Sequence, residues 1–121
     1  MKIKTVPAMT YLPTDEEVAG AKRSIRNLIP NADRYEYVIE SVFVRNDEIS
    51  LAELLDVMAC VAINRAARVH GYVMDELEMY AALALVYRPY RQLVEDGKLV
   101  EHMRVAGRYQ MRSFVTLGGA R

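Results

Sequence analysis

The sequence predicts a mainly α-helical single domain that ends in a C-terminal β-hairpin. Three observations lead to this fold class. Apolar residues recur at three- and four-residue spacing along most of the chain, helix-starting signatures precede several of these stretches, and the pattern changes to alternation after Gly97. A chain of 121 residues with 52% hydrophobic and 26% charged residues can bury one core and is too apolar for intrinsic disorder. We therefore expect one domain over residues 1–121.

The N-terminal residues 1–13 are expected to form an extended arm. They contain two lysines without an apolar stretch behind them, so they lack the pattern of a secretory signal. The longest uncharged apolar runs, residues 57–63 and 79–87, are much shorter than the ~20 residues of a membrane span. We expect a cytoplasmic protein with no membrane partner.

The first helix is predicted over residues 15–28. Thr14 and Glu17 have the spacing of a capping box, in which each side chain accepts a hydrogen bond from the backbone N–H of the other. Pro30 disfavours helical geometry in the residue before it, which ends the helix. The next segment, residues 35–45, fits either a helix or a strand. A helix is favoured, followed by an extended link over residues 44–49.

The central core helix is predicted to follow Ser50, which has Glu53 at the capping-box spacing. Its apolar stripe persists for about five turns and comprises Leu51, Leu54, Leu55, Met58, Ala62 and Ala66. His70 suits a helix C-terminus, and Gly71 can adopt the left-handed conformation that ends a helix. Cys60 lies within the apolar pattern and is expected to be a buried, inert thiol.

Two further helices are predicted around Pro89. Asp75 and Glu78 mark the start of the first, which should end near Tyr87 because proline lacks a backbone N–H. Pro89 suits the first position of a new short helix over residues 89–96. Helical spacing directs one set of its residues inward, Tyr90, Leu93 and Val94, and another outward, Arg88, Arg91, Gln92 and Glu95.

The C-terminal hairpin is predicted after Gly97, which should stop the short helix. Apolar and polar residues then alternate as far as Leu117, which indicates two strands with one buried face. That face would comprise Leu99, Met103, Val105, Tyr109, Met111, Val115 and Leu117. The turn contains Ala106 and Gly107, but alanine resists positive φ, so the turn type and loop length stay open.

Charge is distributed unevenly along the chain, although the formal net charge is zero. Residues 1–84 contain 9 lysines and arginines against 13 aspartates and glutamates, a balance of 9 − 13 = −4. Residues 85–121 contain 7 against 3, a balance of 7 − 3 = +4. The helix and hairpin at the C-terminus therefore carry the excess positive charge.

The stretch VYRPYRQLVEDGKLV, residues 86–100, resembles the recognition helix and first wing strand of winged helix-turn-helix proteins. The resemblance extends through Leu117 and implies a winged-helix-like unit over residues 75–117. In this family the helix packs against two preceding helices, ends at a turn such as Glu-Asp-Gly and continues into a hairpin called the wing. The family's usual glycine or capping serine between the two helices is absent from residues 81–86. The residues that match the pattern are Leu93, Val94, Asp96, Gly97 and Leu99.

This resemblance implies a DNA-binding regulatory protein whose partner is double-stranded DNA. Such binding needs side chains that reach base edges and cations that reach phosphates. The first set would be Arg88, Arg91 and Gln92, and the second Lys98, Arg104, Arg108 and Arg112. A homodimer formed through the longer helices would double the basic surface.

The alternative is a protein-binding inhibitor or adaptor with no nucleic-acid contact. Its acidic N-terminal two-thirds would engage a basic partner, or its tyrosines and arginines would anchor an interface. The hairpin arginines would then be a solvated face that prevents edge-to-edge strand pairing.

Enzymatic activity, metal binding and a cofactor are not expected. His70 and His102 have no carboxylate or cysteine at a ligand or triad spacing, and the chain has no glycine-rich phosphate loop. Glu36 and Glu40 would lie one helical turn apart, but no second acidic pair with histidine accompanies them.

Overall fold

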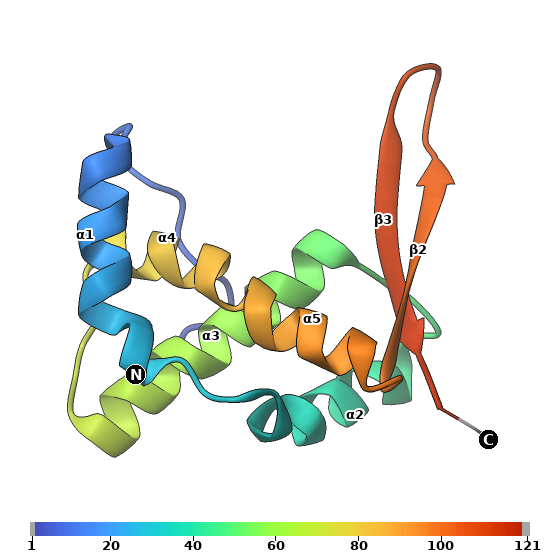
Figure 1. Ribbon diagram of the computed structural model, residues 1–121, viewed down its shortest axis with the longest axis horizontal. Coiled ribbons are helices and arrows are strands. Elements are labelled where there is room, and N and C mark those ends of the chain that lie inside the picture. The colour runs from blue at the N-terminus through green and yellow to red at the C-terminus, as the bar shows by residue number, and fades with distance from the viewer. Residues whose placement is uncertain (1, 120–121) are drawn as a thin grey trace.

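The computed structural model describes residues 2–119 as helices packed beside a small antiparallel sheet (Figure 1). A mainly helical chain with a C-terminal hairpin is confirmed, and a third strand, which the sequence did not reveal, joins the hairpin. The α-helices are α1 (Asp15–Ile25), α2 (Glu36–Arg45), α3 (Leu51–His70), α4 (Glu76–Leu85) and α5 (Tyr87–Glu95), with 3₁₀ turns η1 (Arg26–Leu28) and η2 (Ala32–Tyr35). The strands are β1 (Ile49–Ser50), β2 (Leu99–Val105) and β3 (Met111–Leu117).

Helices α1, α3 and α4 begin where side-chain capping predicts. Thr14 and Glu17 exchange hydrogen bonds with each other's backbone N–H at 3.1 and 3.0 Å, and Asp75 caps α4 together with Glu78 in the same way. The Ser50 hydroxyl accepts a hydrogen bond from the N–H of Glu53 at 3.1 Å. Each cap satisfies a backbone donor that the first helical turn leaves without a partner.

Two predicted helix boundaries need correction. The first helix is α-helical only as far as Ile25 and then tightens into η1, so the chain turns before Pro30. The ambiguous segment 35–45 is helical, as favoured, but α2 continues through Arg45 and the extended link begins at Asn46. The N-cap of α2 is Tyr35, a buried residue at the end of η2.

The core is centred on α3. Leu54, Met58, Ala62 and Ala66 recur every four residues on one face of this helix, and all four are fully buried. The helix ends at Gly71, whose φ of 64° is the left-handed conformation expected there. The N-terminal arm is fastened along α3 because Ile3 exchanges two backbone hydrogen bonds of 3.0 Å with the Asn64 side chain.

Helices α4 and α5 meet at a single residue, Val86. Its N–H donates to the carbonyl of Ala82, and its own carbonyl accepts from the N–H of Tyr90. Pro89 is therefore the third residue of α5, and the prediction that it would be the first is wrong. The position still lies in the first turn, where the missing N–H of proline has no partner within α5 to lose.

Helix α5 ends at Gly97, which has a φ of 75°. The N–H of Lys98 donates to the carbonyl of Leu93 and the N–H of Gly97 donates to that of Val94, which together form a Schellman motif. The motif reverses the chain so that β2 starts two residues later. The side chains of Tyr90 and Leu93 are buried, in agreement with the predicted inward face.

The sheet has the strand order β1-β3-β2, and all its strands are antiparallel. Leu99 pairs with Leu117 at the base of the hairpin and Val105 pairs with Met111 at its outer end. A five-residue loop, 106–110, joins the strands and is closed by a 2.8 Å hydrogen bond from Ala106 N–H to the Gln110 carbonyl.

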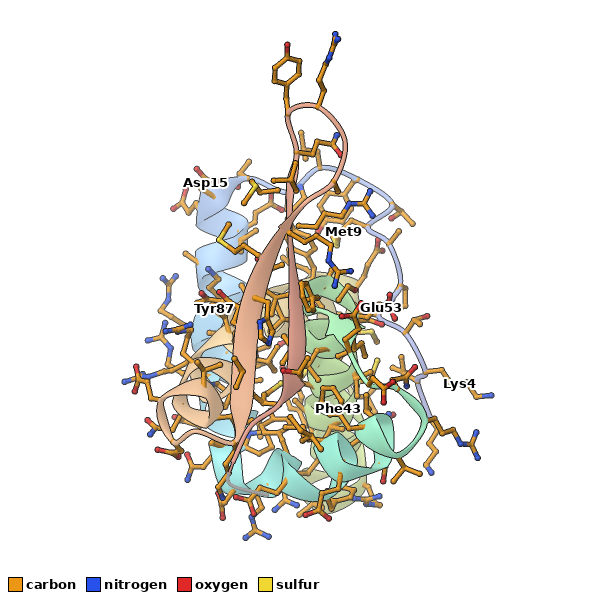
Figure 2. All side chains as sticks on the ribbon, turned by 90° about the vertical axis from the view of Figure 1, so that its right-hand side faces the viewer. Lys4, Met9, Asp15, Phe43, Glu53 and Tyr87 are labelled. Atoms are coloured by element: carbon orange, nitrogen blue, oxygen red, sulfur yellow. The ribbon has the colours of Figure 1, made fainter. Side chains whose placement is uncertain are left out.

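The prediction of one buried hairpin face is right at the base and wrong further out. Leu99 and Val115 are buried, whereas Met103, Val105 and Met111 are exposed. Tyr109, which was predicted to belong to a strand, lies in the loop and is exposed. The reason is visible in Figures 1 and 2: the hairpin extends beyond the helices, so no helix within residues 2–119 covers these side chains.

Candidate nucleic-acid interface

The exposed side of α5 carries the residues that were predicted to face base edges. Arg88 and Gln92 are exposed and lie one helical turn apart, and the side chain of Arg91 is partly exposed beside them. The Gln92 amide donates a 2.9 Å hydrogen bond to the Asp96 carboxylate. Buried Pro89, Tyr90 and Leu93 hold the opposite side of the helix against the core.

A buried phenol joins this helix to the hairpin. The Tyr90 hydroxyl donates a hydrogen bond to the Glu101 carboxylate on β2, and Arg91 lies 3.9 Å from the same carboxylate. Burial, followed by this hydrogen bond, raises the pKa of Tyr90. Arg91 is thus held by an internal carboxylate, and its guanidinium is not fully available to an external partner.

Lys98 and Arg104, both predicted to contact phosphates, also have internal carboxylate partners. Lys98 pairs with Glu36 at the start of α2. Arg104 makes two hydrogen bonds of 3.1 Å to Glu48, in the link before β1. These ion pairs tie the hairpin to the segment around α2 and β1.

Arg104 belongs to a stacked layer on one face of the hairpin. Its guanidinium lies 4.1 Å from the centroid of the Phe114 ring, which also stacks with the His102 imidazole at 4.9 Å between centroids. His102 Nε2 lies 2.8 Å from the Thr116 hydroxyl. His102, Phe114 and Arg104 therefore contact one another in a row on this face of the hairpin.

The other predicted phosphate contacts, Arg108 and Arg112, are exposed. Arg108 lies in the loop at the end of the hairpin, and Arg112 is directly opposite Arg104 in the strand register. Within residues 2–119, neither these two arginines nor Arg88 forms an ion pair with a carboxylate. Among the predicted cations, these three are the ones left available to an external anion.

The structure therefore separates the seven predicted DNA-contact residues into two groups, one on α5 and one along the hairpin. Arg88, Arg91 and Gln92 are brought together on α5, whereas the loop with Arg108 lies at the end of the hairpin that is far from α5 (Figure 1). The acids that neutralise the other cations, Glu36, Glu48 and Glu101, were not identified from the sequence. Glu36 and Glu48 lie 62 and 56 residues from their partners, so no local pattern could have indicated them.

A groove of about 900 Å³ borders the exposed side of α5. Arg88, Arg91 and Gln92 line one wall, and Arg26 and Asp33 are the charged groups of the wall formed by η1, η2 and the residues between them. Apolar residues complete the lining, among them Ile29, Pro30, Leu85, Tyr87 and Pro89. Three arginines against one aspartate make the groove suited to an anionic or acidic ligand.

The described residues contain no metal-ligand cluster, a buried cysteine and no helix that could span a membrane. Between residues 2 and 119, no three side chains of histidine, cysteine, aspartate or glutamate gather as metal ligands would. The free thiol of Cys60 is buried, as predicted, and burial raises its pKa to about 11, so it stays protonated near neutral pH. None of the helices in this range has the length and apolar character needed to cross a membrane.

Comparison with known proteins gives no assignment: no protein-family model, curated protein or solved structure matches this chain.

Proposed function

We propose that this chain is a DNA-binding regulatory protein that places α5 against base edges and the hairpin arginines against phosphates. The observation that carries the proposal is the arrangement of its unpaired cations. Arg88 lies beside Gln92 on the exposed side of α5, and a short turn leads directly to a hairpin that presents Arg108 and Arg112. A helix that offers an amide next to an arginine has the donors and acceptors that base edges in the major groove require.

The order of the elements supports a winged-helix-like unit. A short strand precedes α3, a bent helical pair α4–α5 follows it, and the hairpin β2–β3 then pairs with the first strand through β3. The glycine or capping serine that the family places between these two helices is absent from residues 81–86, and α4 and α5 meet at Val86 instead. The likeness concerns topology, and the function itself is argued from the side chains.

Internal ion pairs limit the strength of the proposed interaction. Because Lys98 and Arg104 already contact carboxylates, two of the four predicted phosphate contacts, Arg108 and Arg112, remain free in one copy. Each phosphate contact adds about −0.9 to the slope of log K against log salt concentration, so we expect a slope of roughly −2 per copy from this set.

The test is a mobility shift on mixed-sequence duplex DNA at low and moderate salt, with a matched pair of variants. Arg112 and Arg104 face each other in the strand register, but Arg104 is bound to Glu48. Arg112→Ala should weaken binding to all sequences and reduce the salt slope by about one, and Arg104→Ala should change both much less. Absence of binding by the wild type at low salt would overturn the proposal.

Sequence discrimination is tested separately through Gln92. Gln92→Ala should relax the preference at one base pair, by roughly 1–3 kcal/mol, and leave the salt slope unchanged because glutamine releases no counterion. Equal effects of Gln92→Ala and Arg112→Ala on all sequences would contradict a base-reading role for α5.

A second candidate, a protein-binding inhibitor or adaptor, is favoured by the groove beside α5. Its apolar lining together with Arg26, Arg88 and Arg91 suits an acidic segment of a partner protein that also offers an apolar side chain. The mobility shift separates the two functions. A protein adaptor would leave the DNA free at low salt, and its complex with the partner would be weakened by Arg26→Ala, which lies outside α5.

A further inference from the structure

The outer half of the hairpin has an apolar face that the described chain leaves uncovered. Met103, Val105 and Met111 lie on the same side of the two strands as the buried base residues, because Val105 pairs with Met111 and Met103 with Ser113. We call these three residues with Ser113 the outer apolar face. Met103 is 63% exposed, Val105 is 66% exposed and Met111 is 56% exposed.

This face continues the core-facing side of the sheet past the point where the helices end. At the base, Leu99 and Val115 are covered by the core, and Glu101 meets Tyr90 of α5. Further out, Figure 1 shows the hairpin extending past the helices, and its loop end also projects above them in Figure 2. The largest exposed apolar patch of a protein often serves as a binding surface, and this sheet face is open to another molecule.

We propose that a second copy of this chain covers the outer apolar face, with the two faces stacked across a two-fold axis. The face bears no charged side chain, so two identical copies can meet on it without repulsion. The opposite face cannot meet its own copy in this way, because Arg104 and Arg112 stand side by side there. Contact through a shared apolar face is the isologous arrangement that most homodimers use.

The area available sets the expected strength of the dimer. With Tyr109, which is 91% exposed in the adjoining loop, the exposed side chains offer roughly 500 Å² per copy, or about 1,000 Å² in total, if each side chain measures about 150–200 Å². That total is near the lower limit for a specific interface, so the dimer should dissociate on dilution. Methionine side chains suit such a contact because they adapt to an opposing apolar surface.

The proposed dimer is compatible with the proposed DNA contacts and does not depend on them. Stacking the outer apolar faces leaves the arginine-bearing faces of both hairpins directed outward. Two copies would then present twice the number of free arginines, so a dimer could contact twice as many phosphates although its net charge is also zero.

The experiment measures the mass of the protein in solution without DNA, by sedimentation velocity over a wide concentration range. Val105→Lys places a charge on the outer apolar face, and Val44→Lys is its control on α2, where the valine is 81% exposed. Wild type and Val44→Lys should shift from monomer to dimer as the concentration rises. Val105→Lys should raise the dissociation constant at least about tenfold, because each copy buries an unpaired charge.

A control on the same hairpin separates this proposal from DNA binding. Arg112→Ala alters the opposite face, so it should leave the dimer unchanged while it weakens DNA binding. Circular dichroism checks that each variant remains folded, and Met111→Lys supplies a second substitution on the outer apolar face. A wild-type protein that stays monomeric at the highest concentration overturns the proposal, as does a dimer that Val105→Lys and Met111→Lys leave intact. Neither result would affect the mobility-shift test.

Discussion

The buried hydroxyl of Tyr90 donates a hydrogen bond to the carboxylate of Glu101 and thereby fastens α5 to the first strand of the hairpin. Arg91, the next residue along α5, approaches the same carboxylate. The exposed side of α5 is therefore positioned by a residue of β2. Interactions that fix these two elements relative to each other can be tested by stability measurements.

Tyr90 and Tyr35 allow a matched test, because both side chains are fully buried. Tyr90→Phe removes a hydrogen bond to a carboxylate and should lower the free energy of unfolding by about 1–2 kcal/mol. Within residues 2–119 the Tyr35 hydroxyl has no hydrogen-bond partner, so Tyr35→Phe should leave stability unchanged or raise it by up to about 1 kcal/mol. Urea unfolding measures both, and equal losses in the two variants would contradict this account.

Three glycines should respond differently to alanine. At Gly118 a Cβ atom would lie 2.3 Å from the Gly97 carbonyl oxygen, so Gly118→Ala must move the base of the hairpin and should cost well over 1 kcal/mol. Gly97→Ala meets no atom but forces alanine into a φ of 75°, at a cost of about 1–2 kcal/mol. Gly20→Ala, within α1, should stabilise by about 0.5–1 kcal/mol. Thermal unfolding that ranks these variants in any other order would be inconsistent with the geometry.

The ion pair between Arg104 and Glu48 should make a small but measurable contribution to the free energy of unfolding. Both side chains are about half exposed, so solvent screens the pair, and its coupling should be no more than about 1 kcal/mol. A double-mutant cycle with Arg104→Ala and Glu48→Ala measures that coupling, which should decline with added salt. The Phe114 ring adds a contribution to Arg104→Ala that Glu48→Ala lacks, so the arginine variant should lose more stability.

Alkaline pH should destabilise the protein partly through Cys60. Burial, followed by the charge of Asp56, raises the pKa of this thiol from its ordinary 9.0 to about 11. Between these values the unfolded chain has released a proton that the folded chain retains. The contribution of Cys60 is therefore complete below pH 9 and is lost as the pH rises through 11. The free energy of unfolding should fall less steeply across this range in Cys60→Ala than in the wild type, and parallel curves would contradict the assignment.

The parts of this fold that depend on neighbouring residues could be predicted from the sequence. Thr14 and Asp75 cap two helices, and Gly71 and Gly97 end two helices. These four features depend only on residues a few positions away, and all four occur in the structure. The start of α5 was misplaced because proline is acceptable at any position of the first turn. Local sequence signals thus predict the presence of a helix more reliably than they predict its first residue.

Features that join distant segments could not be predicted in this way. The short strand β1 and the acids that bind Lys98 and Arg104 are defined only by contacts with residues far along the chain. Alternation in the hairpin identified which residues share a face, but it contains no information on whether another element covers that face. The exposure of Met103 and Met111 followed from the length of the hairpin relative to the helices.

Ile49 pairs with Val115, so the small sheet can form only late during synthesis of the chain. Helices α1 and α3 both pack against α4, so these three helices can assemble while the chain is still leaving the ribosome. β1 must wait for β3, and Glu48 must wait for Arg104, until almost all the described residues have been made. A nascent chain would therefore carry a finished helical body before it acquires the hairpin, and the surface proposed to bind DNA would be the last part of the molecule to mature.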